Sequence, residues 1–218
     1  MEASKAAAPA KKLGLERSWT RASIVAATEA LIREQGFAKL TSRMVAARAG
    51  LKPPLIHYYF NTMDDLYVEV FRQGAEADLA RLNAALESDR PLRALWMVSC
   101  DPKSTRFIIE FMALANNNDA IRSEITLYAE KRRRFQADAI ARHLAERGET
   151  PKIDPLVTAV LMENVARGLV LESALDLSLG HEEVEAFLET CLSDLEARGV
   201  APPENQALLP VKPPRRGR

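Results

Sequence analysis

The side chains that most often perform enzyme chemistry are scattered along this chain of 218 residues. His57, His143 and His181 are far apart in sequence and have no zinc-ligand spacing, and no glycine-rich phosphate loop is present. Ser99-Cys100-Asp101 is a local turn and not a catalytic triad. The sequence therefore predicts a protein that is not an enzyme and that holds no metal or cofactor.

A different chemistry, hydrogen bonding to a polyanion, is available in the stretch Thr41–Phe60, TSRMVAARAGLKPPLIHYYF. It predicts two short helices joined by a tight turn at Ala49-Gly50. Thr41 or Ser42 caps the first helix, and Pro53-Pro54 fit the first turn of the second. Two helices joined by a glycine-containing turn are the helix-turn-helix layout, whose second helix enters the major groove of DNA.

The polar side chains of this stretch suit phosphates and base edges. Hydroxyls at a helix N-terminus and basic side chains bind phosphates, whereas tyrosine and histidine can also reach bases. For His57 the alternative is local capping or packing, and Phe60 is a better core candidate than Tyr59. The predicted DNA-contacting residues are Thr41, Ser42, Arg43, Lys52, Pro53, Leu55, His57, Tyr58 and Tyr59.

Hydrophobic spacing on either side of this stretch predicts the rest of a small helical unit. A helix is expected from Thr20 to about Gln35, followed by Gly36 in a left-handed conformation and a core-facing Phe37. Thr62 is expected to cap a further helix.

A series of residues between positions 20 and 67 keeps the spacing of a known DNA-binding unit. The series is Thr20, Gly36-Phe37, Thr41, Arg43, Ala46, Ala49-Gly50-Leu51, Ile56, Tyr59-Phe60 and Leu66. With these residues the segment resembles the DNA-binding domain of the TetR family of bacterial repressors. Two positions depart from the family pattern: Met63 stands where a Lys often contacts the DNA backbone, with Lys52 or Arg48 as possible compensation, and His57 stands where Tyr is usual.

The resemblance implies an all-α fold, in which an N-terminal three-helix helix-turn-helix DNA-binding domain precedes a C-terminal helical ligand-binding and dimerisation bundle. The expected divisions are a disordered basic tail over 1–17, the DNA-binding domain over 18–62, the effector-binding and dimerisation domain over 63–200, and a disordered C-terminal tail over 201–218. For the basic tail, the alternative is an arm that contacts DNA phosphates.

Beyond residue 62 the periodicity predicts helices over about 63–87, 92–98, 103–115, 119–147, 155–177 and 182–198. An effector pocket could be built from apolar and polar residues of these helices. The predicted pocket residues are Trp96, Phe107, Phe111, Met112, Tyr128, Phe135, Asn164 and Arg167. For the apolar residues, the alternative is ordinary helix core. For Asn164 and Arg167, the alternative is an internal hydrogen bond or a dimer contact.

The basic run Lys131–Arg134 covers more than one helical turn, so its charges point in several directions. It predicts a solvated surface, and the alternative is a site for an anionic effector such as an acyl-CoA. The last two helices carry apolar series that could pair with a second copy in a four-helix bundle. These series are Leu156-Val160-Leu171-Leu175 and Val184-Leu188-Cys191-Leu195.

The charge distribution separates the two parts of the chain, although the net charge is zero. Residues 1–60 hold 10 Lys and Arg against 4 Asp and Glu, so this basic end is the part expected to meet a polyanion. No run approaches the roughly 18 apolar residues of a membrane helix. The N-terminus lacks a secretion-signal core, and Cys100 and Cys191 are expected to be buried thiols in a reducing cytoplasm.

These observations predict a cytoplasmic, ligand-responsive transcriptional regulator. We expect a repressor that binds a palindromic site on double-stranded DNA as a homodimer and is released by a small, hydrophobic effector. Two alternatives remain open: a helical ligand-binding or scaffold protein with a vestigial helix-turn-helix, and a helical enzyme, for which the sequence offers no constellation of residues.

Overall fold

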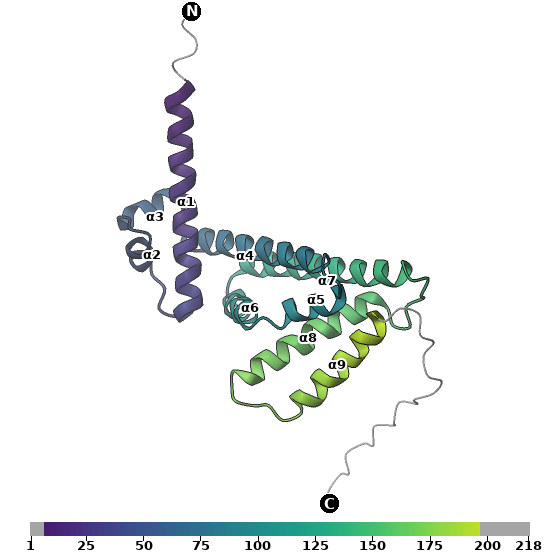
Figure 1. The fold of residues 1–218 in the computed structure, drawn as a ribbon. Coiled ribbons are helices and arrows are strands. Elements are labelled where there is room, and N and C mark those ends of the chain that lie inside the picture. The colour runs from purple at the N-terminus through teal and green to yellow at the C-terminus, as the bar shows by residue number, and fades with distance from the viewer. Residues whose placement is uncertain (1–6, 197–218) are drawn as a thin grey trace, which may run out of the picture.

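The computed structural model describes residues 7–196, and within this range the chain forms nine helices and no strand (Figure 1). The helices are α1 (Ala7–Gln35), α2 (Ser42–Arg48), α3 (Pro53–Tyr59), α4 (Met63–Ala85), α5 (Pro91–Ser99), α6 (Pro102–Ala115), α7 (Asp119–Ala145), α8 (Pro155–Ser173) and α9 (His181–Glu196). The predicted all-α fold class is confirmed. No helix in the described part of the chain is long and apolar enough to cross a membrane.

The first helix starts earlier than the sequence predicted. It begins at Ala7 and not near Thr20, so the expected disordered tail over 1–17 does not describe residues 7–17. The physical reason is that alanine, lysine, leucine, glutamate and arginine dominate this stretch, and all of them favour helix. Extending an existing helix also costs far less than nucleating one. The expected C-terminal tail, 201–218, lies outside the described residues.

Helices α1 to α4 share one apolar core with α6 and the start of α7. Ile24, Val45 and Ile56 from the first three helices are fully buried together with Phe71 of α4 and Phe111 of α6. The apolar faces of the first three helices are thus buried partly against α4, α6 and the start of α7. The predicted division at residue 62 therefore falls inside one continuous core, and the division stays a prediction.

The aromatic rings at this junction show how the two parts are joined. Phe37, which follows α1, packs edge-on against Tyr67 of α4 at 5.0 Å and against Phe111 of α6 at 4.9 Å between ring centroids. Gly36 has φ of +71°, the left-handed conformation predicted for the end of α1. This turn brings the Phe37 ring back onto the core.

A second apolar core lies between α5, α7, α8 and α9. It contains Leu95 of α5, Ile140 of α7, Ala159 of α8 and Leu192 of α9. Leu188 and Leu195 of α9 also pack against this core, so they are not on the outer face that the sequence assigned to them for dimerisation.

Between the two cores, the bundle buries a network of polar side chains. Asp78 of α4, Arg132 of α7 and Glu163 of α8 are each about 5–6% exposed. Arg132 Nε donates to Asp78 Oδ2 at 3.1 Å, and the Tyr128 hydroxyl donates to the same oxygen at 2.6 Å. The prediction of a solvated basic run is therefore wrong for Arg132. The spacing did not reveal that two of the four adjacent cations bind carboxylates on other helices: Arg132 binds Asp78 of α4, and the half-buried Arg133 binds Glu163 of α8 at 3.2 Å.

The Arg132–Asp78 pair gives a direct test of this buried network. We expect Arg132→Met to lower the free energy of unfolding by about 3 kcal/mol, because it removes one of the partners of a buried carboxylate. Arg134→Met is the matched control on the same helix, since methionine and arginine have similar helix propensities. Arg134 is exposed and pairs only with Glu130, also exposed, so its loss should cost about 0.5 kcal/mol or less. Urea unfolding at one protein concentration measures both values, and equal losses would contradict the buried role of Arg132.

Candidate functional site

Helices α2 and α3 form the helix-turn-helix that the sequence predicted. Thr41 caps α2, with its side-chain oxygen accepting from the Met44 backbone N–H at 3.3 Å. Gly50 has φ of +68°, which the tight turn requires, and Leu51 N donates to the Ala46 carbonyl at 2.8 Å. Pro53-Pro54 occupy the first turn of α3, where missing N–H groups leave no helix bond unmade.

The packing of these two helices divides their side chains into an inner and an outer set. Val45, Ala46 and Ile56 are buried, and Phe60 is only 3% exposed, so Phe60 is the core ring as predicted. Ser42 and Tyr59 are half-buried. The other predicted DNA-contacting residues are exposed: Thr41, Arg43, Lys52, Pro53, Leu55, His57 and Tyr58.

The positive charges around α2 and α3 are not equivalent. Arg48 is engaged by Glu34 of α1, and this pair lowers the pKa of Glu34 through hydrogen bonding to the guanidinium. Arg43 and Lys52, by contrast, have no carboxylate partner among the side chains that the structure describes. Met63 packs against the first core, and whether Lys52 or Arg48 compensates for the cation that is missing there stays a prediction.

Two arginines of α1 reach this unit, although the sequence analysis did not single them out. Arg17 Nη2 donates to the Tyr58 hydroxyl, and its Cζ lies 5.4 Å from the centre of the Tyr58 ring. Arg21 lies over the Phe60 ring at 4.8 Å. Their four-residue separation, which puts both on one face of a helix, was the available signal, but Arg17 fell in the presumed tail.

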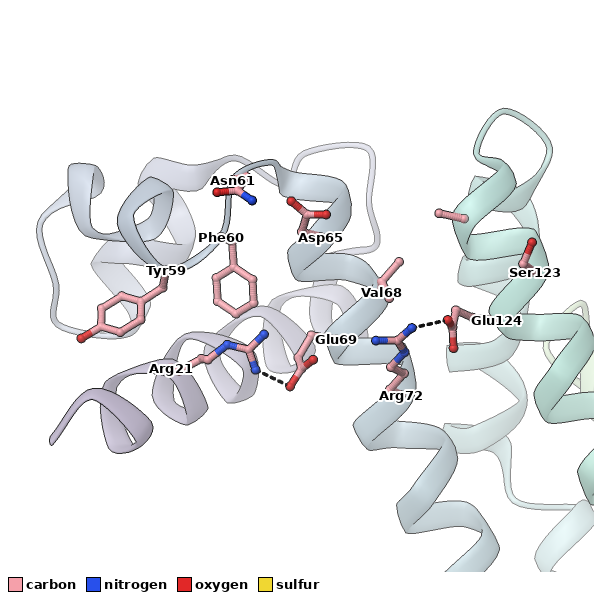
Figure 2. A pocket seen from close by; sticks show the side chains of 11 residues that line it. Arg21, Tyr59, Phe60, Asn61, Asp65, Val68, Glu69, Arg72, Ser123 and Glu124 are labelled. Carbon is pink, nitrogen blue, oxygen red and sulfur yellow. Dashed lines mark hydrogen bonds and ion pairs between the residues drawn. The ribbon is translucent and has the colours of Figure 1, made fainter. Parts of the chain in front are cut away.

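A groove of about 510 Å³ separates α3 and the start of α4 from the first turns of α7. Figure 2 shows two ion pairs along it. Arg21 of α1 binds Glu69 of α4 at 2.6 Å, and Arg72 of α4 binds Glu124 of α7 at 2.5 Å. Because Glu69 and Arg72 are one turn apart on α4, they link that helix both to the DNA-binding unit and to the bundle.

The predicted effector-pocket residues do not gather around one cavity. Phe107, Phe111 and Tyr128 belong to the first core, whereas Trp96 and Phe135 belong to the second. The two cores are separate because the buried polar network lies between them. A cavity of about 30 Å³ beside α4 and α6 is lined by Phe71, Gly74, Asp78, Arg81, Phe107 and Tyr128, among others. Only Phe107 and Tyr128 of the predicted set touch it.

Three of the predicted pocket residues lie away from this cavity and have other surroundings. Met112 is 43% exposed. Asn164 is exposed and donates to the Val160 carbonyl at 2.8 Å on its own helix. Arg167 binds Glu163 at 2.5 Å, so both polar residues have the internal partner that was the stated alternative.

The remaining reactive side chains do not form a common site. His57, His143 and His181 lie on α3, α7 and α9. Among the described residues, no group of three His, Cys, Asp or Glu could hold a metal ion. Both cysteines are free and half-buried. Burial raises the pKa of the Cys100 thiol to about 11, so it is protonated at neutral pH.

Helices α8 and α9 lie at the edge of the bundle (Figure 1). Several of their large apolar side chains are exposed. The most exposed large apolar side chains within these helices are Leu161 of α8, 55% exposed, and Phe187 of α9, 65% exposed. Leu156, Leu171, Leu175 and Val184 of the predicted series are exposed as well. An apolar face of this kind is typical of a surface that another protein covers.

Comparison with known proteins also finds a helix-turn-helix unit in the N-terminal part of the chain. Residues 24–70 match the family model described as bacterial regulatory proteins, tetR family. A TetR-family transcriptional regulator from Rhodococcus sp. superimposes with a TM-score of 0.66 at 21% sequence identity, covering 83% of this chain and 100% of that chain. No curated protein matches the sequence.

Two further solved structures have the same fold. A transcriptional regulator from Saccharomonospora viridis, in complex with choline, has a TM-score of 0.68 at 20% identity and covers 79% of this chain and 96% of its own. The reduced form of NemR from E. coli has a TM-score of 0.67 at 17% identity, and the match covers 78% of this chain and 96% of NemR.

Residues 24–70 thus match the model of the TetR-family DNA-binding domain, and the chain as a whole has the fold of solved TetR-family transcriptional regulators. The matched family model is described as bacterial regulatory proteins, which agrees with the expectation of a regulator. The fold supports a DNA-binding regulator.

Proposed function

We propose that this protein is a transcriptional repressor that binds a palindromic operator as a homodimer and is released by a small molecule. The proposal rests on the outer side of α2 and α3. Seven of the nine predicted contact residues are exposed there, and Arg43 and Lys52 have no described carboxylate partner. Unpaired cations beside a helix-turn-helix suit the phosphates that flank a major groove. Such a repressor acts where its operator lies, in the cytoplasm.

The exposed residues divide by chemistry into two roles. Thr41, Ser42, Arg43 and Lys52 suit phosphates; although Thr41 already accepts a cap hydrogen bond, its hydroxyl proton remains available to donate. On α3, His57 and the two tyrosines suit base edges, and an apolar side chain such as Leu55 suits a thymine methyl group. These roles explain why α3 keeps an exposed leucine and Tyr58 with 61% exposure.

The homodimer is supported by the outer face of α8 and α9. Two copies that cover this face would bury Leu161 and Phe187 in a four-helix arrangement. A twofold dimer also places two recognition helices on one operator, where half-sites one helical turn apart require a separation of about 34–36 Å.

Release by an effector requires the bundle to change shape. The cavity between α4 and α6, about 30 Å³, has room for about one water molecule. An effector that enters there must separate α6 from α4. Helix α6 also contacts the end of α1: Arg33 donates to the Lys103 carbonyl at 2.9 Å, and Phe37 N donates to Glu110 at 3.4 Å. Movement of α6 would therefore reach the DNA-binding unit.

The chemistry of this cavity refines the predicted hydrophobic effector. Aromatic rings of Phe71, Phe107 and Tyr128 form its walls, while Asp78 and Arg81 add charge. We therefore expect an effector with an apolar body and a polar group that replaces some of the hydrogen bonds of the buried network. Its preference for the released conformation must amount to several kcal/mol to change operator occupancy strongly.

Lys52 tests the DNA-binding proposal. We expect Lys52→Ala to weaken operator binding and to reduce the slope of log K against log salt by about 0.9 for each protomer, or about 2 for a dimer. Fluorescence anisotropy over a salt series measures the slope. Lys152→Ala, an exposed lysine between α7 and α8, is the matched control and should leave the slope unchanged. An unchanged slope for Lys52→Ala would remove this residue from the interface.

The outer face of α8 and α9 tests the dimer. We expect the double substitution Leu161→Glu and Phe187→Glu to give monomers at micromolar concentration, because it introduces charges that a dimer would have to bury. Operator affinity should fall when the dimer is lost. Leu127→Glu is the control, since Leu127 is 66% exposed on α7, away from this face. Sedimentation equilibrium measures the oligomeric state of each variant. A monomeric wild-type protein would contradict the proposed dimer.

Gly74 tests the movement of α6. A Cβ atom at this position of α4 would lie 2.7 Å from Cε1 of Phe107 on α6. The ring has little room to turn, because Phe71, Phe111 and Arg33 surround it. We therefore expect Gly74→Ala to separate the two helices and to weaken operator binding roughly fivefold or more, as a bound effector would.

The control for Gly74→Ala removes the clash. Adding Phe107→Leu to the same chain should restore much of the lost affinity, while circular dichroism and thermal unfolding confirm that both variants are folded. Unchanged operator affinity in a folded Gly74→Ala variant would contradict the proposed coupling between α6 and the DNA-binding unit.

A further inference from the structure

The N-terminal turns of α1 project past α3, as Figure 1 shows, and no other helix covers them in that view. The helix runs without interruption from these turns into the buried part of α1, where Ile24 and Val25 are fully buried. The projecting turns are thus attached to the core of the DNA-binding unit by continuous helix.

Arg17 marks the place where this projection meets the recognition helix. Its guanidinium donates to the hydroxyl of Tyr58 and lies over the Tyr58 ring. No carboxylate pairs with Arg17 among the side chains that the structure describes, whereas Arg21, one turn later, is paired with Glu69. The positive charge of Arg17 is therefore available at the edge of the surface proposed to read DNA.

The net charge of the projecting turns is also positive. Residues 7–17 contain Lys11, Lys12 and Arg17 against a single acidic residue, Glu16. Ten helical steps from Ala7 to Arg17 span about 15 Å, which corresponds to about four or five base pairs of DNA. A basic helix of that length, beginning beside a base-reading tyrosine, fits the phosphates just outside a half-site.

We propose that the N-terminal turns of α1 are a second DNA-contacting element, which binds phosphates that flank each half-site. The inference rests on the proposed function and extends it, because it assigns to DNA a segment outside the helix-turn-helix. Arg17 connects the two elements: it contacts Tyr58 on one side and faces flanking phosphate on the other. The occupant is a polyanionic duplex, since the segment is rich in basic residues and its described cation, Arg17, has no carboxylate partner among the described side chains.

The test compares two operator duplexes with wild-type protein and with a triple variant, Lys11→Ala, Lys12→Ala and Arg17→Ala. One duplex carries about five additional base pairs outside each half-site, and the other ends at the half-sites. We expect wild-type protein to bind the longer duplex more tightly and with a salt slope steeper by about 2 or more, one phosphate or more per protomer. The triple variant should bind both duplexes with similar affinity and slope.

Two controls separate this role from a structural one. Arg142→Ala removes an exposed arginine at the far end of α7 and should keep the wild-type preference for the longer duplex. Trp19 is 78% exposed on α1 and Trp96 is 7% exposed, so acrylamide quenches mainly Trp19. The longer duplex should protect this fluorescence more than the shorter one.

The outcomes that overturn the inference are distinct. If wild-type protein binds both duplexes with one affinity and one slope, flanking DNA makes no contact and the inference fails, while the proposed function stands. If the triple variant loses operator affinity by the same factor on both duplexes, Arg17 acts only by holding Tyr58, and the inference fails as well. If no palindromic duplex is bound at all, both the inference and the proposed function fail.

Discussion

The packing of Phe37 between Tyr67 and Phe111 is the contact on which the arrangement of this molecule depends. The apolar side chains of the helix-turn-helix unit are buried in a core that α4, α6 and the start of α7 complete. This sharing orients the recognition helix relative to the bundle. A change in the position of α6 would therefore alter the support of the DNA-binding unit, which is the physical basis of the coupling proposed between an effector and DNA affinity.

Ion pairs and hydrogen bonds reinforce this junction without replacing the apolar contact. Arg21 with Glu69 and Arg72 with Glu124 link α1, α4 and α7 along one groove. These side chains are partly exposed, so each pair contributes little stability by itself. Their value lies in geometry, because they favour one relative position of the three helices. The buried pair of Arg132 and Asp78 is different, since its desolvation makes the loss of one partner costly.

The distribution of paired and unpaired cations separates structural arginines from those available to DNA. Arg48 was a candidate from its position, yet it is paired with Glu34 on another helix, and Arg21 is likewise paired with Glu69. Arg43 and Lys52 keep their charge unpaired among the described residues, and Arg17 does so beside the recognition helix. A sequence cannot show this difference, because Glu34 and Glu69 are far from their partners in the chain.

Local chemistry along the chain was sufficient to predict the helices and the recognition unit. These features each act within a few residues, and the structure confirms them: a cap at Thr41 or Ser42, a cap at Thr62, a left-handed Gly36, a tight turn at Ala49-Gly50, and Pro53-Pro54 in a first turn. The start of α1 was wrong because the absence of hydrophobic periodicity before Thr20 was taken for disorder, although the residues there favour helix.

Only the tertiary structure decided which side chains meet. It divided the predicted pocket between two cores, buried Arg132, turned Phe187 outward in place of Leu188, and brought Arg17 to Tyr58. Each of these depends on the angle between helices that are distant in sequence, and helical periodicity does not specify that angle. Sequence periodicity therefore determined which faces are apolar, whereas packing between helices determined what each face contacts.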